Sequence, residues 1–390
     1  MIKRIIIIAI NVLCLIAFII CLSVSASIRT QLRSQQAASA WAGQSGERFS
    51  QISVFFPESF GFNEDAVQSL RHTLDDALLD ASLESTPGRK LYTDAWSTEI
   101  DVSIVGERGQ ASVRAIAVGG DFFFFHPLYI RDGSYLSPND VMKDRVVIDE
   151  ELAWRLFGAT RVSGFDIIID NRPFVIAGVV SRESDFASLK AYMYGILSRE
   201  SDFSGSYAST HSAGLFMSFE ALSEMTAGEI TDEEADEGAI ISNYEIVMPN
   251  PVTGFALNAL TEAIPETEIH VVENSTRFSL SNLFSVIGSF GERSMRPGAI
   301  SFPYWENAAR FAEDWLALLL LLSLIFIAFP IVCAVFYGIK IIRLLLKQGK
   351  RTTKKVMDDI ENRKYEKYKL EHGEDGEAYG TDTEYDDIIY

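Results

Sequence analysis

Two long stretches without a charged residue constrain this chain more than any other feature of its sequence. Residues 5–24 form an uncharged stretch of twenty residues, and residues 315–338 form a second one of twenty-four. As a helix the second stretch is about 36 Å long, enough to cross a hydrocarbon core of about 30 Å. We therefore expect two transmembrane helices, at 5–24 and 315–338, with a large domain at 27–314 between them, which we call the outer domain.

The first stretch has an alternative interpretation as a cleaved signal peptide, because the small residues Ser25, Ala26 and Ser27 follow it. The apolar core of a signal peptide usually spans about 7–15 residues, fewer than here, so a retained anchor is favoured. Pro330 lies inside the second stretch, where neighbouring helices can satisfy the freed carbonyl. Trp315 and Tyr337 stand at its two ends, as interfacial aromatic residues do.

Basic residues indicate the orientation of both helices. Lys3 and Arg4 precede the first helix, and seven Lys and Arg residues follow the second between positions 340 and 355. By the positive-inside rule both termini are expected in the cytoplasm and the outer domain outside the cell membrane. The cytoplasmic parts are then residues 1–4, a basic juxtamembrane segment at 339–369 and an acidic tail at 370–390.

Composition excludes two other classes of protein. The chain has 34 Lys and Arg residues against 54 Asp and Glu residues, a net charge of −20, which argues against a nucleic-acid binder. Its three cysteines, Cys14, Cys21 and Cys333, all lie in apolar stretches, so a disulfide framework is excluded.

The outer domain has the pattern of a mixed α+β fold with two similar halves. In the first half, a strand at 50–56 precedes a helix that Asn63 caps, and a strand follows at 97–105. In the second half, a strand at 244–248 precedes a helix that Asn250 and Pro251 are expected to start, and a strand returns at 268–272. These strand–helix–strand halves, at 45–118 and 240–280, are expected to form one lobe.

Between the halves, residues 119–215 have the pattern of an inserted β-rich lobe. A strand at 145–148 leads into a helix that begins after Asp149 and ends at Gly158. Two further strands, at 165–169 and 174–180, flank a hairpin turn at 170–173. We expect this lobe to bury Leu152, Leu156 and Phe157, together with Val175, Ile176 and Val179.

Several blocks of this insertion are familiar in order and spacing. They are Gly119-Gly120-Asp121-Phe122-Phe123, the segment Leu128 to Gly133, the block from Val146 to Leu152-Ala153-Trp154-Arg155-Leu156-Phe157-Gly158, and the hairpin from Ile167 to Phe174-Val175-Ile176-Ala177-Gly178-Val179. Together they resemble the MacB-like periplasmic core domain of ABC transporter permeases of the FtsX–MacB type. The resemblance covers about residues 1–340 and is sharpest at 119–182.

The resemblance implies a porter-like lobe built from the two halves, an inserted second lobe, a bacterial cell-membrane location and a separate ABC ATPase that hydrolyses ATP. The sequence agrees in one respect, since it has no Gly-rich phosphate-binding loop. It departs in another, because such permeases have three helices after the outer domain and this chain has one. It therefore either pairs with further permease subunits or acts as an accessory subunit.

No residues in the sequence stand out as a catalytic, cofactor-binding or metal site, and we expect none. The polar segment Ser209 to Ser212 has no nucleophile motif around it, and the acidic segment Thr231 to Gly238 lacks the spacing of a calcium loop. The histidines are scattered without ligand spacing: they are His72, His126, His211, His270 and His372.

Segments on both sides of the second predicted helix suggest contacts with the membrane or with partners. Leu280, Leu283, Phe284 and Ile287 are spaced like one helix face, and the aromatic segment 302–307 is expected either to anchor in the membrane interface or to contact a partner's helices. The stalk that follows should present a polar face: Glu306, Arg310, Glu313 and Asp314. The basic segment 339–369 is expected to bind anionic lipid or an ATPase, and the tail at 370–390 has a disordered composition.

Two functions remain open. The first is a non-catalytic subunit of an ABC-type transporter or mechanotransmission complex. The second is a stand-alone surface binding or sensory protein with two membrane anchors. A gene for an ATPase or a four-helix permease next to this one would favour the first.

The topology is testable by labelling. In a variant without the native cysteines, a cysteine at position 200 should react with a membrane-impermeant maleimide in intact cells, because the outer domain is expected outside. A cysteine in the tail at 370–390 should react only after the cells are opened. Labelling of the tail from outside intact cells would contradict the topology.

Overall fold

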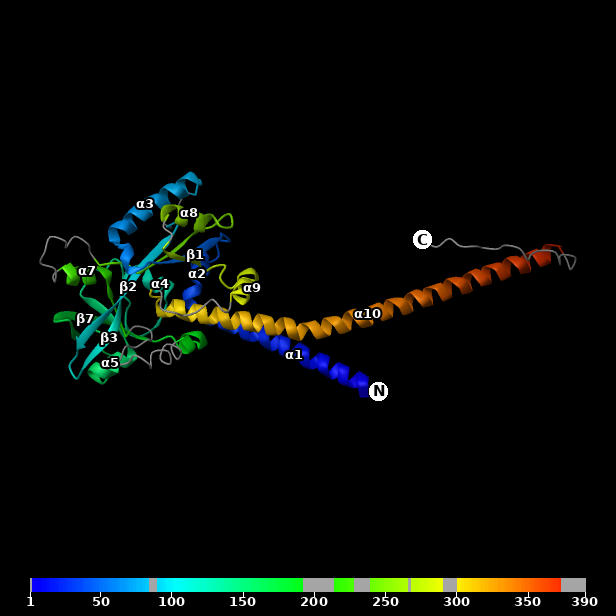
Figure 1. Ribbon diagram of the computed structural model, residues 1–390, viewed down its shortest axis with the longest axis horizontal. Coiled ribbons are helices and arrows are strands. Elements are labelled where there is room, and N and C mark those ends of the chain that lie inside the picture. Colours follow the sequence, from blue (N-terminus) through cyan, green and yellow to red (C-terminus); the bar gives the residue numbers. More distant parts are fainter. Residues whose placement is uncertain are drawn as a thin grey trace. The chain divides into compact units, whose positions relative to one another are not determined.

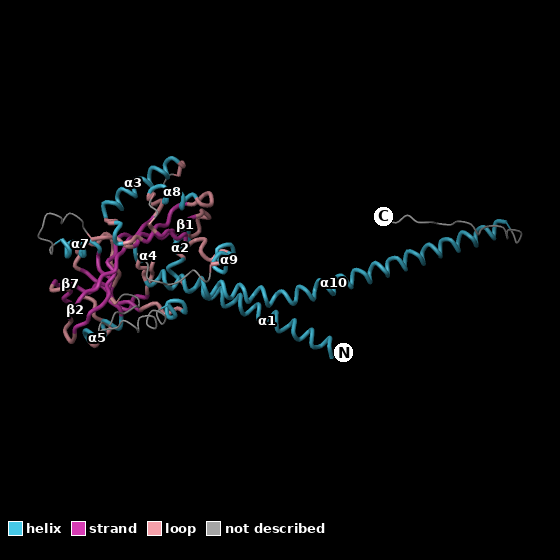
Figure 2. The backbone as a smooth tube through the Cα atoms, viewed as in Figure 1, coloured by secondary structure: helices cyan, strands magenta, loops and turns pink. Residues whose placement is uncertain are grey.

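The centre of the outer domain is a ten-stranded sheet, seen in the computed structural model of the chain (Figures 1 and 2). The structure describes residues 2–83, 90–191, 214–227, 239–265, 268–289 and 300–372. Along the sheet the strands follow the order β10-β1-β9-β2-β3-β8-β5-β7-β4, and β6 pairs with β2 and β7. The strands are β1 Phe49–Phe55, β2 Thr93–Val105, β3 Gln110–Gly120, β4 Tyr129–Gly133, β5 Arg145–Asp149, β6 Asp166–Ile169, β7 Arg172–Ser181, β8 Leu215–Ser218, β9 Asn243–Pro249 and β10 His270–Glu273.

Helices cover both faces of this sheet. Buried residues of α3, α5, α7 and α8 share one hydrophobic cluster, and residues of α2, α4 and the start of α10 share another. The helices are α1 Ile2–Gln31, α2 Ala37–Ala42, α3 Glu64–Asp80, α4 Phe122–Phe125, α5 Glu150–Phe157, α7 Phe219–Ala227, α8 Phe255–Ala263, α9 Leu280–Gly288 and α10 Tyr304–His372, with short 3-10 turns at Arg33–Gln35 and Glu58–Phe60.

The first half of the outer domain matches its prediction closely. The side chain of Asn63 accepts a hydrogen bond of 3.0 Å from the backbone N–H of Ala66 and so caps α3. The spacing of three and four residues predicts one buried face at Val67, Leu70, Leu74, Leu78 and Ala81. The first four are buried, whereas Ala81 follows the end of the helix and is exposed. The expected strand is β2, which starts four residues earlier than predicted, at Thr93. The predicted break at Pro87 and Gly88 lies outside the described residues.

In the second half the elements are confirmed but the predicted helix start is wrong. Helix α8 begins at Phe255 after Gly254, which adopts a left-handed conformation with φ +89°. Asn250 does not cap a helix at Pro251; its side chain reaches the N–H of Ala256 across a turn, at 3.4 Å. Val252, which would line a helix that starts at Pro251, lies before α8 and is exposed. The turn between Asn250 and Phe255 displaces the helix by one turn.

The insertion contains the local structures that its sequence predicts. Asp149 caps α5 through the N–H of Leu152, and Gly158 ends the helix at φ +69°. Strands β6 and β7 form the expected hairpin, in which Asp170 and Asn171 both have positive φ, the signature of a type I′ turn. The strands of the insertion do not form a sheet of their own, however. Strand β3 pairs with β2 on one side and with β8 on the other, and so joins them to the rest of the sheet.

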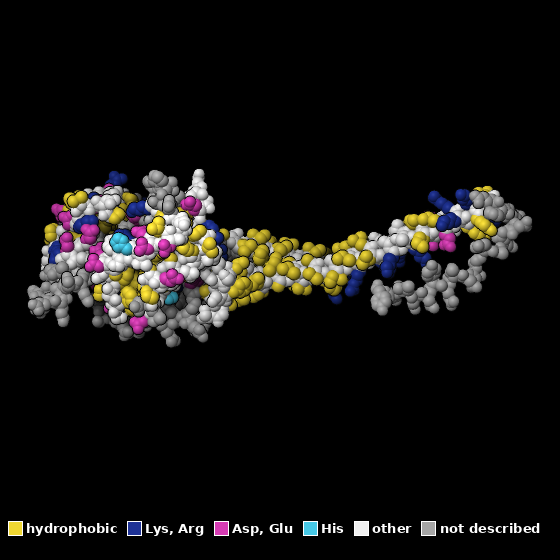
Figure 3. Space-filling view, turned by 90° about the horizontal axis from the view of Figure 1, so that it is seen from above, with side chains coloured by type: hydrophobic (Ala, Val, Ile, Leu, Met, Phe, Trp, Pro, Cys, Tyr) yellow, Lys and Arg dark blue, Asp and Glu magenta, His cyan; other side chains and the backbone are white. Residues whose placement is uncertain are grey.

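Two long helices, α1 and α10, contain the predicted transmembrane stretches. Both have an apolar window long enough to span a membrane, and only 6% of each window is buried in the chain. Hydrophobic side chains cover the surface of the apolar helical stretch, and Lys and Arg side chains gather beyond it (Figure 3). Helix α10 passes through Pro330 and continues to His372, so the basic segment 339–369 is helical. Residues 373–390 of the acidic tail lie outside the described residues.

By their contacts the residues divide into two units. One comprises Ile19–Ser323 and contains the whole sheet, and the other comprises Met1–Phe18 and Leu324–Tyr390. The outer domain, the last turns of α1 and the first turns of α10 therefore form one structural unit.

Helix α5 offers a matched test of the core. Phe157 is 5% exposed and packs edge-on against Phe165, whereas Trp154 on the same helix is 64% exposed. Phe157→Ala should lower the free energy of unfolding by about 3–5 kcal/mol because it leaves a cavity. Trp154→Ala should change it by less than about 0.5 kcal/mol, as at most surface sites. Equal melting temperatures of the two variants in lipid nanodiscs would contradict the assignment of Phe157 to the core.

Candidate functional site: a buried ionic junction at the start of helix α10

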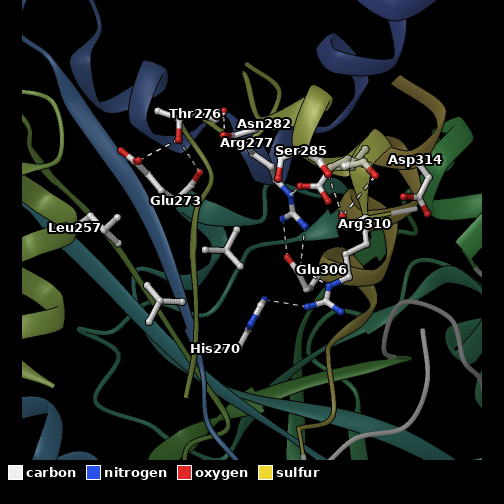
Figure 4. Close-up of a pocket in the computed structure, with 15 residues that line it drawn as sticks. Leu257, His270, Glu273, Thr276, Arg277, Asn282, Ser285, Glu306, Arg310 and Asp314 are labelled. Atoms are coloured by element: carbon white, nitrogen blue, oxygen red, sulfur yellow. Dashed lines mark hydrogen bonds and ion pairs between the residues drawn. The ribbon is translucent and has the colours of Figure 1, made fainter. Parts of the chain in front are cut away.

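The most unusual chemistry in the outer domain surrounds Arg277, in the turn between β10 and α9. Its side chain is only 3% exposed, although Arg is almost never fully buried unless it is paired. It lies against the first turns of α10, the helix that leads into the second apolar stretch (Figure 4). A buried cation at this point needs buried anions, and α10 supplies them.

Two carboxylates of α10 pair with this guanidinium. Arg277 donates from Nη1 and Nη2 to the two oxygens of Glu306, at 2.7 and 2.8 Å, and from Nε to Glu313 at 2.6 Å. The bidentate pair with Glu306 has the fork geometry that makes Arg–carboxylate pairs strong and directional. Because Glu306 and Glu313 lie seven residues apart, Arg277 bridges two turns of one helix face. We call Arg277, Glu306, Glu313, Arg310 and His270 the junction.

The carboxylate of Glu306 is held in its charged form. Burial by itself would raise the pKa of Glu306, but the charges and hydrogen bonds of Arg277 and Arg310 outweigh it and lower the pKa below its usual range. Burial likewise opposes the charge on Arg277, and the two glutamates reverse that effect and raise its pKa further. The pair of Arg277 and Glu306 is therefore charged on both sides at neutral pH.

Arg310 extends the junction toward the sheet edge. Its Nε donates to Glu306 at 2.8 Å, its Nη2 contacts Nε2 of His270 on β10 at 3.0 Å, and its guanidinium lies 3.6 Å from the centre of the Phe302 ring. Burial, and then the charge of Arg310, lower the pKa of His270. His270 is therefore neutral at pH 7, so its Nε2 can accept the hydrogen bond from Arg310.

A chain of buried polar groups connects the junction, through β1 and β9, to His126. Arg277 donates to Asn274 at 3.3 Å, Asn274 donates to Ser53 on β1 at 2.7 Å, and Ser53 donates to Glu245 on β9 at 2.9 Å. The second oxygen of Glu245 pairs with Nε2 of the fully buried His126 after α4. Such a network fixes the side chains that it joins, because each member left without its partner would be costly.

An aromatic side chain of α10 packs against the His126 end of this network. Trp305 of α10 is fully buried, with its ring 4.3 Å from that of His126 and 5.6 Å from that of Phe122. Phe302 packs on Phe55 of β1. The expectation that segment 302–307 anchors in the membrane interface or contacts a partner's helices is therefore wrong for these two residues, which pack on the outer domain's own sheet.

The first apolar helix is attached to the same strand as the second. Gln51 of β1 accepts a hydrogen bond from the N–H of Ala37 in α2 at 3.0 Å and donates to the carbonyl of Ser34 at 2.7 Å. Ile28 near the end of α1 and Leu32 just after it are both buried. Both apolar helices thus enter the outer domain on one face of the sheet, with β1 between their attachment points.

An open cavity of about 800 Å³ lies between β10, α9 and the junction (Figure 4). Its walls are mixed: Val272 and Val286 are apolar, and Asn282, Ser285 and the junction residues are polar. Among its carboxylates, Glu306 and Glu313 are paired with Arg277, and Glu273 accepts hydrogen bonds from the hydroxyls of Ser50 and Thr276. The ion pairs between Arg277 and the two glutamates hold α10 against the turn that follows β10.

The predicted absence of a metal site stays a prediction. Among the described residues, no three His, Cys, Asp or Glu side chains come together as a metal site. His72 is exposed on α3, while His126 and His270 have the partners given above. His211, segment 209–212, segment 231–238 and the side chain of His372 lie outside the described residues.

The sequence predicts only part of the junction. Glu306, Arg310 and Glu313 were expected as a polar face, and their spacing of four and three residues is the signal for it. That face is buried rather than solvated, apart from the partly exposed Arg310. Arg277 was not identified, because nothing near it in the sequence points to a partner almost thirty residues away.

Comparison with known proteins gives one family. The model of the MacB-like periplasmic core domain matches residues 5–212, more than half of the chain. No curated protein matches the chain.

Three similar solved structures can be described. The periplasmic region of MacB from Actinobacillus actinomycetemcomitans is 17% identical with a TM-score of 0.37, over 63% of this chain and 94% of that one. The extracellular domain of a noncanonical ABC-type transporter, YknZ, from Gram-positive bacteria is 13% identical with a TM-score of 0.33, over 57% and 100%. A domain of a permease protein from Porphyromonas gingivalis is 14% identical with a TM-score of 0.30, over 62% and 97%.

Removing the central cation tests the junction. Arg277→Met should lower the free energy of unfolding by about 3–5 kcal/mol, because Glu306 and Glu313 stay buried after losing their ion pairs with Arg277. Adding Glu306→Gln and Glu313→Gln to it should recover a large part of that loss. Arg155→Ala, which removes an exposed Arg paired with Glu151 on α5, is the control and should cost less than about 1 kcal/mol. If thermal unfolding in nanodiscs shows no rescue in the triple variant, the ion pairs are not what stabilises this site.

Proposed function

The chain belongs to the MacB-like periplasmic core domain family of ABC transporter permeases, and on that premise we propose that it is a non-catalytic membrane subunit of an ABC-type transporter or mechanotransmission complex. In this role the outer domain responds to movements of the membrane helices, which a separate ATPase drives. The alternative is a stand-alone surface binding or sensory protein with two anchors.

The observation that carries the proposal is the junction. A flexible anchor needs no buried charges, yet here Glu306 and Glu313 are paired with Arg277 at the start of the helix that enters the membrane. A shift of α10 along its axis would separate these ions inside a poorly hydrated site, at a cost of several kcal/mol. Helix and sheet therefore move together, as a part that transmits force must.

We further propose that the outer domain works as two lobes. The units β1–α3–β2 and β9–α8–β10 would form the porter-like lobe, at 45–118 and 240–280, and residues 119–215 the inserted lobe. Strands β2 and β3 pair along eleven residues from Ala95–Gly120 to Val105–Gln110. Because β2 also pairs with β6 and β3 with β8, this ribbon would connect the two lobes. Displacement of β1 by α10 would then change the angle between the lobes through this ribbon.

The partners follow from the number of helices. Two spans are too few to line a path for a polar solute, so we propose further permease subunits beside this chain. We also propose that both termini are cytoplasmic. The basic helical segment 339–369 would then contact either anionic lipid or the ATPase from the cytoplasmic side. The chain itself would bind no nucleotide, metal or nucleic acid and would catalyse no reaction.

Co-purification tests the partnership. Tagged full-length protein, extracted from its native host in mild detergent, should carry an ATPase and at least one further membrane protein, identified by mass spectrometry. If the chain is isolated without a membrane partner and its phenotype survives deletion of every candidate ATPase, it is a stand-alone surface protein instead.

Coupling is tested on the same complex with spin labels. Labels at the exposed positions Leu79 on α3 and Trp154 on α5 should change their distance when ATP is added. Glu313→Gln, which removes one charge from the junction, should reduce that change while ATP hydrolysis continues. The control Arg155→Ala should leave both unchanged. A full distance change in Glu313→Gln would show that the junction does not carry the movement.

A further inference from the structure

Helix α9 carries an apolar face that the described part of the chain leaves uncovered. Leu280 is 61% exposed and Phe284 is 51% exposed, and four residues apart they are neighbours on the helix surface. Leu283 and Val286 of the same helix are buried and hold it on the outer domain. The exposed pair is therefore not a disordered end but a fixed surface, oriented by the buried pair.

Helices α9 and α10 are neighbours, because residues of both line the same cavity. Asn282 and Ser285 of α9, and Ser289 just after it, line this cavity together with residues of α10, which are Glu306, Arg310, Glu313 and Asp314 (Figure 4). The uncharged stretch of α10 begins at Trp315, the residue after Asp314. The α10 residues that line the cavity lie between positions 306 and 314, and a helix rises about 1.5 Å per residue. Helix α9 therefore lies beside the last turns of α10 before the predicted membrane span. Figure 1 shows α9 on that side of the sheet.

The composition of α9 suits a membrane interface. From Ser279 to Ser289 the chain has no charged residue, so entering the headgroup region requires no charge to be dehydrated. Leu and Phe are the side chains that interfacial helices insert at the boundary of headgroups and acyl chains. Trp315 of α10 is partly exposed and marks the same boundary on the neighbouring helix.

We propose that α9 is a second membrane contact of this chain, lying in the interface of the leaflet on the outer-domain side with Leu280 and Phe284 inserted among the lipids. Lipid is the occupant because the span that begins at Trp315 brings the bilayer to this height whether or not a partner is bound. In this proposal α9 makes the membrane-interface contact that was expected of residues 302–307. The sequence predicted this helix only from the spacing of its apolar residues.

The contact has a mechanical consequence. Arg277 lies three residues before α9 and is bonded to Glu306 and Glu313. A helix resting on the bilayer surface therefore fixes the height of the junction above the membrane. Movement of α10 relative to the bilayer would be opposed at α9 and directed into the sheet through Asn274 and Ser53.

Lipid exposure of α9 is measurable by electron paramagnetic resonance. In full-length protein with Cys14, Cys21 and Cys333 replaced by Ser, a nitroxide is attached at Phe284→Cys or, in a second variant, at Leu280→Cys. The matched control is Leu79→Cys on α3, a leucine with 65% exposure in the same outer domain. Each protein is reconstituted into nanodiscs of phosphatidylcholine and phosphatidylglycerol, without any partner.

The measured quantity is the ratio of accessibility to oxygen, which concentrates in lipid, over accessibility to a water-soluble nickel chelate. The proposal expects this ratio to be several-fold higher at positions 280 and 284 than at 79. Equal ratios at all three positions would mean that α9 is in water and would overturn it. Low accessibility to both reagents at 280 and 284 would mean that a second copy of the chain covers the face, and would overturn it as well.

Discussion

A guanidinium removed from water is costly until it is fully paired, and Arg277 is paired only when α10 is in place. Neither Glu306 nor Glu313 belongs to the sheet, so the turn after β10 acquires a stable structure only when the helix supplies its two carboxylates. In return, the helix is fixed in rotation by a bidentate contact and in translation by a contact two turns further along. Apolar packing of Trp305 alone would allow some sliding, because dispersion contacts have little directional preference. The ion pairs remove that freedom and determine which face of α10 meets the sheet.

The polar row beneath α10 also explains why the face of the sheet looks as it does. Gln51, Ser53 and Glu245 alternate along β1 and β9 with apolar residues that point to the opposite cluster. Such alternation is usual for a strand with one face in water. Here the polar side is covered by α2, α4 and α10, and its groups bind the covering segments instead of solvent. Polar residues that could face water in another sheet therefore bind, in this one, the segments that lead into the two apolar helices.

Local signals in the sequence predicted the local structure well. Asn63, Asp149 and Gly158 define helix ends through contacts within a few residues, and the Asp170–Asn171 turn needs only its own backbone preference. The start of α8 was missed because Asn250 and Pro251 fit a helix start equally well, and the decision lay with packing against β1. The junction required a partner for Arg277 from a distant helix, and the burial of Trp305 required knowledge that His126 and Phe122 would form a site for it. Long-range pairs of this kind leave no periodic trace in a single sequence.

The place of β9 in the sheet has a consequence for how the chain is made. Strand β9 lies between β1 and β2, so these early strands have no bond to each other and wait for a partner that is synthesised much later. Closing such a large loop is slow, and the exposed strand edges are prone to pair wrongly in the meantime. The sheet can be completed only shortly before the second apolar helix emerges from the ribosome. Folding of the domain and insertion of its last helix are therefore nearly simultaneous events, and a chaperone or translocon that holds the unfinished strands apart would favour the correct product.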